Sequence, residues 1–375
     1  MKLALIKLGA RVSYGEKDTS GGSGEARMII QILRKSGCQV DVYTKLSKKD
    51  TYPLDEELNF YNISESYENI NNHDYDALIV VNGRVNYFGG AEDRDQILNY
   101  WLINNFNKKV FYFYCDPSLT LSQTWPSVAK KVWAKNWQEK DINITRKDII
   151  YISQPYNLKE VKKVVDKGSI EISNILHFPF EKFPCLLEKL PMKKNPSLDL
   201  SYGGTMRGGK RAKKMVKFYF GYSDKINVEM FGKITAEDLE KVKLKNGSPR
   251  EPIFSGTVPY AKFQEKMNDT LSHVVIGDEW YEGNDFAQRI YESIWASVVT
   301  FIDVDMDPQR KIYGHNEICN KLLYVKDRND VEKIISLIKE KKGLRERIIE
   351  EQFNSINFIE SDYVEELEKL LENNL

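Results

Sequence analysis

A short apolar segment, a glycine-rich turn and a basic helix follow one another between residues 198 and 219 of this 375-residue chain. The predicted strand Leu198–Tyr202 leads into Gly203-Gly-Thr-Met-Arg-Gly-Gly209. Glycines between a strand and a helix let backbone N–H groups approach an anion, and the helix N-terminus adds partial positive charge there. Arg207 and Arg211 are four positions apart, and arginine forks suit the paired oxygens of a diphosphate. The pattern fits a solvated basic helix start equally well, and it lacks the Gly-Lys-Ser/Thr ending of a Walker loop.

The first half of the chain shows the same succession of elements. A strand at Lys2–Leu8 is followed by a glycine-rich loop, a helix at Glu25–Ser36 and a second strand at Gln39–Thr44. This order predicts a βαβ unit of a parallel sheet, although the loop lacks the spacing of a dinucleotide fingerprint. Ala77–Val81 is continuously apolar, which is typical of a parallel strand buried on both faces. The polar residues 45–74 are predicted to lie outside the core.

The second half repeats this organisation after a stretch that contains prolines and lysines. Its further predicted elements are strands at Asn227–Phe231, His273–Gly277, Val298–Ile302 and Leu322–Val325 and a helix at Asn284–Trp295. The linker is marked by Pro184, Pro191 and Pro196. We predict an N-terminal domain at 1–183, a linker at 184–197 and a second domain at 198–357, with a C-terminal helix at 358–375 packing back on the first domain. The predicted fold class is α/β, with two Rossmann-like domains facing a central cleft.

The composition excludes several classes of protein. Lys and Arg together number 55, as do Asp and Glu, so contact with nucleic acid would require a local basic face. The four cysteines and four histidines are scattered, which excludes a zinc site of the usual spacing and indicates reduced cysteines. The first apolar residues are too few, and are interrupted by Lys7, for a signal peptide or a membrane span. These features predict a soluble intracellular protein.

Three further residues suggest chemistry. Asp116 follows the predicted strand Lys109–Cys115, and ligands of open α/β sheets bind beyond the carboxyl ends of strands, although a helix or turn cap would explain this acid equally well. Arg289 and Glu292 are three positions apart on a predicted helix. A buried glutamate accepts hydrogen bonds from two ribose hydroxyls and the arginine reaches phosphate, whereas the alternative is an ordinary surface ion pair. Together these residues suggest a nucleotide-sugar glycosyltransferase of the two-domain GT-B type, with Asp116 as general base.

A specific set of segments occurs in one order along the chain. The set comprises Asp74–Asn82, Asn86–Gly90, Ser122–Pro126, Tyr202–Arg211, Ile276–Asp278, Arg289 and Glu292. In this order the chain resembles the T-even bacteriophage DNA β-glucosyltransferase family over nearly its whole length. The resemblance implies a GT-B fold and the transfer of glucose from UDP-glucose to 5-hydroxymethylcytosine in duplex DNA.

The resemblance also implies a role for each matching position. Asp116 would be the catalytic base, and Glu25 a second carboxylate near the sugar. The implied UDP-sugar-binding residues are Gly204, Thr205, Arg207, Arg211, Val258, Asp278, Tyr281, Arg289 and Glu292. Asn86 would fill the duplex where the target nucleotide is extruded, with Phe88 in the same loop. Arg84 departs from the family pattern and is placed to reach a phosphate beside the extruded base.

The implied reaction is a single inverting displacement by the hydroxymethyl oxygen on C1 of the sugar. A divalent cation, Mg²⁺ or Mn²⁺, would assist through the phosphates of the donor, so no metal-ligating residues are predicted. The family pattern further implies a monomer that acts in the cytoplasm of the infected bacterial cell.

Other departures from the family pattern leave alternatives open. Residues 9–24 are longer and richer in glycine than the pattern, and residues 45–70 are expanded. Glucose is the first choice of donor sugar and arabinose the second, and hydroxymethyluracil or an already glycosylated base is an alternative acceptor. A GT-B enzyme with a non-DNA acceptor would leave Asn86 and its loop without evident purpose. A non-catalytic nucleotide-sugar or DNA-binding module is disfavoured by the joint presence of Asp116, the three arginines and Glu292.

Overall fold

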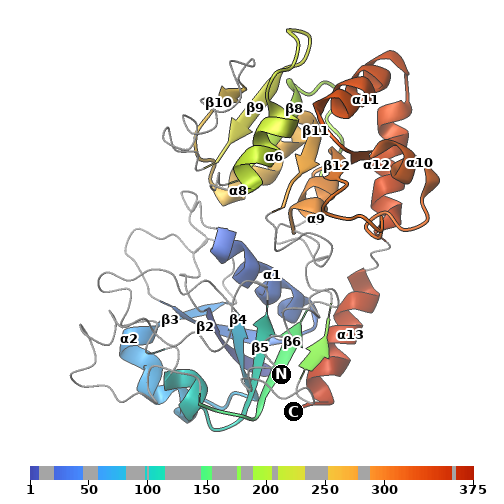
Figure 1. The fold of residues 1–375 in the computed structure, drawn as a ribbon. Helices are drawn as coiled ribbons and strands as arrows, with labels where there is room; N and C mark the ends of the chain where they lie inside the picture. The colour runs from blue at the N-terminus through green and yellow to red at the C-terminus, as the bar shows by residue number, and fades with distance from the viewer. Residues whose placement is uncertain are drawn as a thin grey trace. The chain divides into compact units, whose positions relative to one another are not determined.

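The structure is a computed structural model that describes most of the chain. The described residues are 1–7, 21–44, 58–81, 98, 101–114, 145–153, 175–178, 189–204, 210–232, 252–277, 288–356 and 360–375. The chain divides into two units, one of Met1–Cys185 with Ile359–Leu375 and one of Leu186–Phe358. Each unit contains a parallel sheet with helices, so the predicted α/β class is confirmed (Figure 1).

Within the described residues, the sheet of the first unit has seven parallel strands in the order β3-β2-β1-β4-β5-β6-β7. These strands are β1 (Lys2–Lys7), β2 (Gln39–Thr44), β3 (Asn59–Asn62), β4 (Ala77–Val81), β5 (Lys109–Tyr114), β6 (Ile149–Ser153) and β7 (Ile175–His177). Every residue of the central strand β4 is buried, because helices cover a parallel sheet on both faces. The continuous apolar run in the sequence correctly predicted this strand.

The helices of the first unit come from both ends of the chain. Those with bounds in the described part of the chain are α1 (Gly21–Lys35), α2 (Ile63–Ser66), the short 3₁₀ helix η1 (Tyr67–Asn72) and α13 (Glu360–Glu372). Helix α1 begins at Gly21, before the predicted start at Glu25. The first turn was not predicted because it contains glycines, which are poor helix formers. Helix α13 packs beside α1 (Figure 1): the Ser36 hydroxyl donates to the Val364 carbonyl at 3.4 Å, and the Tyr363 and Phe178 rings lie 4.8 Å apart.

The expectation that residues 45–74 lie outside the core was wrong for the described part of that segment. Strand β3 forms the edge of the first sheet, and Ile63 and Ile70 after it are fully buried. Tyr61 of β3 stacks on Tyr43 of β2 with 5.0 Å between ring centroids. An edge strand has a neighbouring strand on one side only and needs few apolar residues. Its sequence is therefore mostly polar, and the few side chains that enter the core are hard to recognise.

The sheet of the second unit repeats the strand order of the first. Among its described residues the order is β10-β9-β8-β11-β12-β13, again with all neighbours parallel. The strands are β8 (Leu198–Gly203), β9 (Val228–Phe231), β10 (Ile253–Phe254), β11 (Thr270–Val275), β12 (Val299–Asp303) and β13 (Tyr324–Val325). In both units the first three strands are added toward one edge of the sheet and the later strands toward the other edge. This is the doubly wound Rossmann order.

Helices of the second unit connect these strands and cover the sheet. In the ranges that the structure describes they are α6 (Lys210–Tyr219), α8 (Tyr260–Asn268), α9 (Gln288–Trp295), α10 (Glu317–Leu322), α11 (Arg328–Glu340) and α12 (Leu344–Ser355). Strand β10 was not predicted, since it is a short edge strand whose Ile253 is 64% exposed. Leu322, predicted as part of a strand, is the last residue of α10 instead. The Asn316 side chain caps the start of that helix by accepting a hydrogen bond from the Cys319 amide.

The described part of the predicted linker, residues 189–197, is bound to the second unit. The Leu190 amide donates to the Trp295 carbonyl at 2.9 Å, and the Arg345 guanidinium donates to the Lys193 carbonyl at 2.6 Å. Asp269 accepts from the Ser197 hydroxyl at 2.7 Å and pairs with the Lys193 ammonium at 2.5 Å. These bonds hold the approach to β8 in place.

Candidate functional site at the carboxyl edge of the second sheet

The strand order of the second sheet reverses between β8 and β11. Strand β9 lies beside β8 on one side, and β12 lies beside β11 on the other. Ligands of open α/β sheets bind outside the carboxyl ends of the strands at such a reversal. Helices α6 and α9 follow β8 and β11 in the chain, so their first turns lie toward this edge. The topology therefore brings the predicted glycine turn and the Arg289–Glu292 pair to one edge of the sheet.

Two glycines of this edge are required by close packing. Gly232 has a φ angle of +138°, and a Cβ there would lie 1.7 Å from the Gly204 carbonyl oxygen. A Cβ on Gly203 would lie 2.6 Å from the Phe263 ring. The Gly204 amide donates to the Phe231 carbonyl at 2.9 Å, which joins the ends of β8 and β9. Sequence patterns indicated Gly204 for anion contact, but they gave no sign that Gly203 and Gly232 have their own packing roles.

Arg289 and Glu292 form an ion pair on the first turns of α9. Arg289 Nη1 lies 2.6 Å from Glu292 Oε2, and the two side chains are 27% and 10% exposed. The Arg289 guanidinium carbon lies 3.9 Å from the centroid of the Phe263 ring. An ordinary surface ion pair would have a solvated carboxylate and no aromatic contact. The burial of Glu292 and the ring contact of Arg289 therefore favour the site interpretation over the surface one.

An apolar cluster borders this pair. It contains Phe231, Phe263, Met267, Ala296 and Val298, and the half-buried Val258 packs against it. The Phe231 and Phe263 rings are tilted at a centroid distance of 5.4 Å. Val258 comes just before α8, whose residue Phe263 contacts Arg289. Phe263 thus links the glycine end of β8 to Arg289, and Val258 packs against the same cluster.

Helix α6, which carries Arg211 on its first turn, is held to β12 by buried charges. Lys214 Nζ lies 2.6 Å from the carboxylate of Asp303, which is fully buried at the end of β12. Lys217 lies 3.8 Å from the same carboxylate and 3.8 Å from that of Asp305. Arg211 itself is partly exposed. Sequence reasoning missed the Lys214–Asp303 pair, because the two residues are far apart in the chain and each has the appearance of a surface residue.

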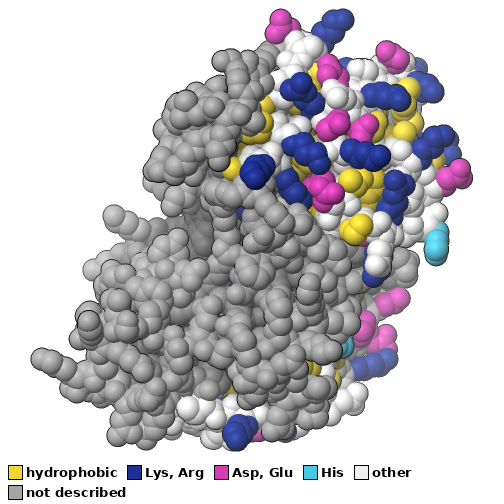
Figure 2. Space-filling model, in the orientation of Figure 1, with side chains coloured by type: hydrophobic (Ala, Val, Ile, Leu, Met, Phe, Trp, Pro, Cys, Tyr) yellow, Lys and Arg dark blue, Asp and Glu magenta, His cyan; other side chains and the backbone are white. Residues whose placement is uncertain are grey.

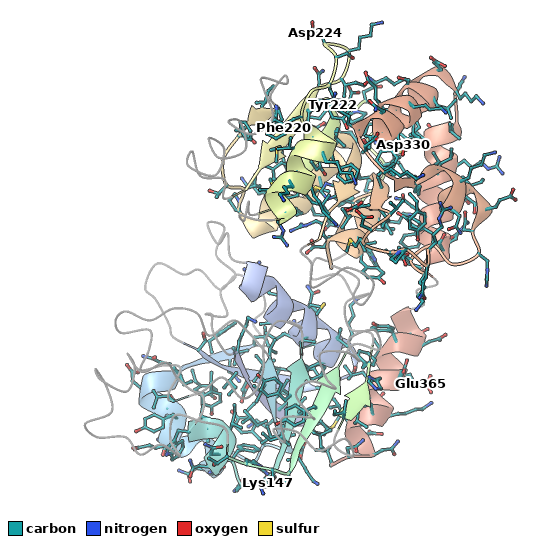
Figure 3. All side chains as sticks on the ribbon, in the orientation of Figure 1. Lys147, Phe220, Tyr222, Asp224, Asp330 and Glu365 are labelled. Atoms are coloured by element: carbon teal, nitrogen blue, oxygen red, sulfur yellow. The ribbon has the colours of Figure 1, made fainter. Side chains whose placement is uncertain are left out.

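The other end of α6 is also anchored. The Tyr219 hydroxyl donates to the Val274 carbonyl at 2.6 Å and accepts from the Val274 amide at 3.0 Å, which joins α6 to β11. The Tyr222 hydroxyl donates to the Phe218 carbonyl at 2.7 Å. Figure 3 shows Phe220 and Tyr222 beside the sheet and Asp224 at the outer tip of the turn to β9. With both ends bound, α6 presents its first turn in a fixed orientation.

His273 lies on β11 and is fully buried. Burial and, to a smaller extent, the nearby charge of Arg289 lower its pKa to about 3. Its Nδ1 atom lies 2.7 Å from the Ser201 carbonyl oxygen. A carbonyl only accepts hydrogen bonds, so the neutral ring carries its proton on Nδ1. His273 therefore adds no positive charge beneath Arg289 at neutral pH.

The remaining predicted site residues cannot be placed in the same way. Glu25 lies in α1, but only its backbone is among the described residues. The predicted residues outside the described part of the chain are Arg84, Asn86, Phe88, Asp116, Thr205, Arg207, Asp278 and Tyr281. Asp116 follows β5, the strand next to β4 in the first sheet. Among the predicted residues, the structure thus brings together Gly204, Val258, Arg289 and Glu292.

The described surface carries charges of both signs. Figure 2 shows Lys and Arg side chains on the second unit interspersed with Asp and Glu side chains. Across the described ranges, no cluster of three or more His, Cys, Asp or Glu residues is arranged to hold a metal ion. Cys38 and Cys319 are free and buried. None of the helices in the described part of the chain combines the length and apolarity needed to cross a membrane.

Comparison with known proteins places this geometry in context. A family described as bacteriophage T4 beta-glucosyltransferase matches residues 1–184. The DNA beta-glucosyltransferase of Enterobacteria phage T4 is 27% identical over 359 residues, which are 95% of each chain.

Solved structures show the same likeness. The structure of T4 phage BGT in complex with UDP and Mn²⁺ has a TM-score of 0.77 and 25% identity, covering 98% of this chain and 99% of that one. A mutant of T4 phage BGT in complex with UDP-glucose has a TM-score of 0.79 and 24% identity, covering 100% of this chain and 99% of that one. The predicted GT-B fold is confirmed by these likenesses.

Proposed function

We propose that this chain, which belongs to the bacteriophage T4 beta-glucosyltransferase family, is a UDP-glucose-dependent DNA glucosyltransferase. The family predicted from the sequence is confirmed, and the chain is an enzyme of the glycosyltransferase class. The observation that carries the proposal is the 27% identity to a DNA beta-glucosyltransferase across 95% of both chains. The paired, partly buried Arg289 and Glu292 support it independently.

The donor nucleotide occupies the carboxyl edge of the second sheet in this proposal. The buried carboxylate of Glu292 accepts hydrogen bonds from the two ribose hydroxyls, and Val258 contacts the uracil ring. Arg289 and Arg211 bind the diphosphate together with Arg207, since guanidinium groups bind phosphate oxygens in pairs. Backbone groups of Gly204 and Thr205 complete the diphosphate site. Asp278 and Tyr281 line the donor side.

A divalent ion, Mg²⁺ or Mn²⁺, enters this proposal bound to the donor phosphates. The relative in complex with UDP also contains Mn²⁺. The ion is assigned to the phosphates of the substrate, as the family resemblance implies. When bound, it would neutralise part of the charge of the diphosphate. The proton transfer and the stabilisation of the leaving group are carried out by side chains of the protein.

The reaction is an inverting displacement. Asp116, which follows β5, removes the proton from the hydroxymethyl oxygen of 5-hydroxymethylcytosine, and Glu25 lies near the sugar. That oxygen forms a bond to C1 of the glucose while the bond from C1 to the UDP oxygen breaks, so an α-linked donor gives a β-linked product. The arginines stabilise the negative charge that develops on the leaving diphosphate.

The acceptor is presented by extrusion of its nucleotide from the duplex. Unstacking costs a few kcal/mol, and Asn86 offsets part of this cost by filling the space that the base has left. Phe88 lies in the same loop, and Arg84 contacts a phosphate beside the extruded base. With no net charge, the chain depends on such local contacts to bind DNA. We propose that the enzyme acts as a monomer in the cytoplasm of the infected cell.

The experiment is a mass analysis of nucleosides after incubation with hydroxymethylcytosine DNA and a panel of UDP-sugars. We expect one hexose on hydroxymethylcytosine with UDP-glucose and no change in unmodified DNA. A pentose in its place would assign arabinose as the donor sugar. No gain with any donor would refute the DNA activity.

The Asp116→Asn variant tests the assignment of the base. Loss of a general base lowers kcat by about a thousandfold, while affinity for UDP persists because Asp116 belongs to the other unit. Single-turnover rates and calorimetric UDP binding measure the two effects. A variant that retains its turnover would exclude Asp116 as the base.

A further inference from the structure

The orientation of Arg289 is determined by two contacts of different kinds. Glu292 binds one edge of the guanidinium group, with 2.6 Å between Nη1 and Oε2. The guanidinium carbon also lies over the Phe263 ring, 3.9 Å from the ring centroid. A planar group held by an ion pair and by an aromatic ring has little freedom to turn. The side chain of Arg289 is 27% exposed, and this exposed part therefore keeps one orientation.

Phe263 is itself held by further contacts. The residue is 8% exposed, and its ring lies against Phe231. Its Cε2 and Cζ atoms would each be 2.6 Å from a Cβ on Gly203, so the ring rests directly on the end of β8. Because Gly203 has no side chain, the Phe263 ring fits in this position. The glycine turn and Arg289, which are far apart in the chain, are thus connected by one aromatic ring.

We propose that Phe263 is a positioning residue that fixes the plane of Arg289 for the diphosphate of the donor nucleotide. This inference rests on the proposed function, in which Arg289 binds that diphosphate. Phe263 acts through Arg289 and not through the nucleotide. A ring held in place keeps the guanidinium oriented before the ligand arrives, so less conformational freedom is lost on binding. The interaction also retains its strength because the ring is buried.

The test compares Phe263→Leu with the wild-type chain in calorimetric binding of UDP and of uridine. Leucine keeps most of the apolar volume but has no ring face, so UDP affinity should fall about fivefold. Uridine affinity should stay unchanged, because uridine has no phosphate for Arg289 to bind. A substitution by tyrosine is unsuitable, since Cζ lies against Gly203 and leaves no space for a hydroxyl.

Phe353→Leu is the matched control. Phe353 lies in the same unit and also carries a cation over its ring, the Lys189 ammonium at 3.8 Å from the centroid. Its ring also packs against Trp295, the last residue of α9, with 5.8 Å between the centroids, whereas Arg289 lies at the start of that helix. Its replacement removes the same kind of interaction, and we expect UDP affinity equal to that of the wild type. An equal loss in both variants would mean that Phe263 contributes only to general stability, and would overturn the inference.

A double-variant cycle with Arg289→Ala separates the possible failures. If Phe263 acts through Arg289, the Phe263→Leu effect on UDP affinity disappears in the Arg289→Ala background. If Arg289→Ala weakens UDP binding but Phe263→Leu does not, the positioning role is refuted and the proposed donor site stands. If Arg289→Ala has no effect, or if the wild type binds no UDP, the proposed donor site fails and the positioning role fails with it. Equal losses for UDP and uridine would also overturn the role.

Discussion

The two sheets share one strand order but use their buried polar groups differently. In the first unit, Asp41 of β2 accepts a hydrogen bond from the Tyr75 hydroxyl at 2.8 Å and one from the Asn59 amide at 2.9 Å. Asn59 opens β3 and Tyr75 precedes β4, so this network lies toward the amino ends of the strands. In the second unit, Asp303 ends β12 and Glu292 follows the carboxyl end of β11.

This difference separates stability from function. Polar groups at the amino ends of strands connect neighbouring strands and are remote from a ligand that binds at the carboxyl edge. Polar groups at the carboxyl edge hold the helices that supply ligand contacts. Changes in the first network should therefore affect unfolding alone, whereas changes in the second should affect unfolding and UDP binding together.

The largest effect is expected at the buried charge pair of the second unit. Asp303→Ala leaves the Lys214 ammonium without its carboxylate in a buried position, which costs about 3 kcal/mol of unfolding free energy. Because Lys214 belongs to α6, the orientation of Arg211 is lost as well and UDP binds more weakly. Urea unfolding and calorimetry measure the two effects.

The double variant Lys214→Met/Asp303→Leu is the control for this change. Apolar side chains of similar size need no charge partner, so most of the stability should return. If the double variant were as unstable as Asp303→Ala, the loss would come from packing and not from the uncompensated charge.

A smaller effect is expected at His273, in the same unit, and it depends on pH. Its pKa is about 3 in the folded chain against an ordinary value of 6.5, so the unfolded chain binds the extra proton between these values. The stability that comes from the neutral ring is complete above pH 6.5 and is lost as the pH falls toward 3. At pH 5 the loss is about 2 kcal/mol.

The His273→Gln variant isolates this contribution. Glutamine donates a hydrogen bond toward Ser201 but does not titrate, so the fall in stability between pH 7 and pH 5 should be smaller than in the wild type. Urea titrations at the two pH values provide the comparison. An equal fall in both chains would show that other groups cause it.

The smallest effect is expected in the first unit. Tyr75→Phe removes a hydroxyl that donates to the buried Asp41 and lies 3.2 Å from the Tyr43 hydroxyl. The carboxylate keeps its Asn59 partner, so the cost is about 1 kcal/mol of unfolding free energy. UDP affinity should not change. A weaker affinity for UDP in Tyr75→Phe would contradict the separation of stability from function.

Several parts of the molecule were predictable because they depend on local chemistry. The apolar run Ala77–Val81 was assigned correctly to a buried parallel strand, since a strand covered on both faces has no polar positions. The strand that begins at Leu198 and the helix that carries Met215 and Phe218 were assigned correctly, because each has its own sequence pattern. The edge strands β3 and β10 were missed, because a strand with one neighbour needs few apolar residues.

The sequence by itself predicted the α/β class, the family resemblance and the candidate donor residues, because periodicity and motif order can be read along the chain. Only the tertiary structure decided what surrounds those residues. The ring of Phe263 between Gly203 and Arg289, and the pairing of Lys214 with Asp303, join segments that no local pattern relates. Contacts of this kind arise when the strand order brings distant strand ends to one edge, so they become visible only once the sheet is assembled.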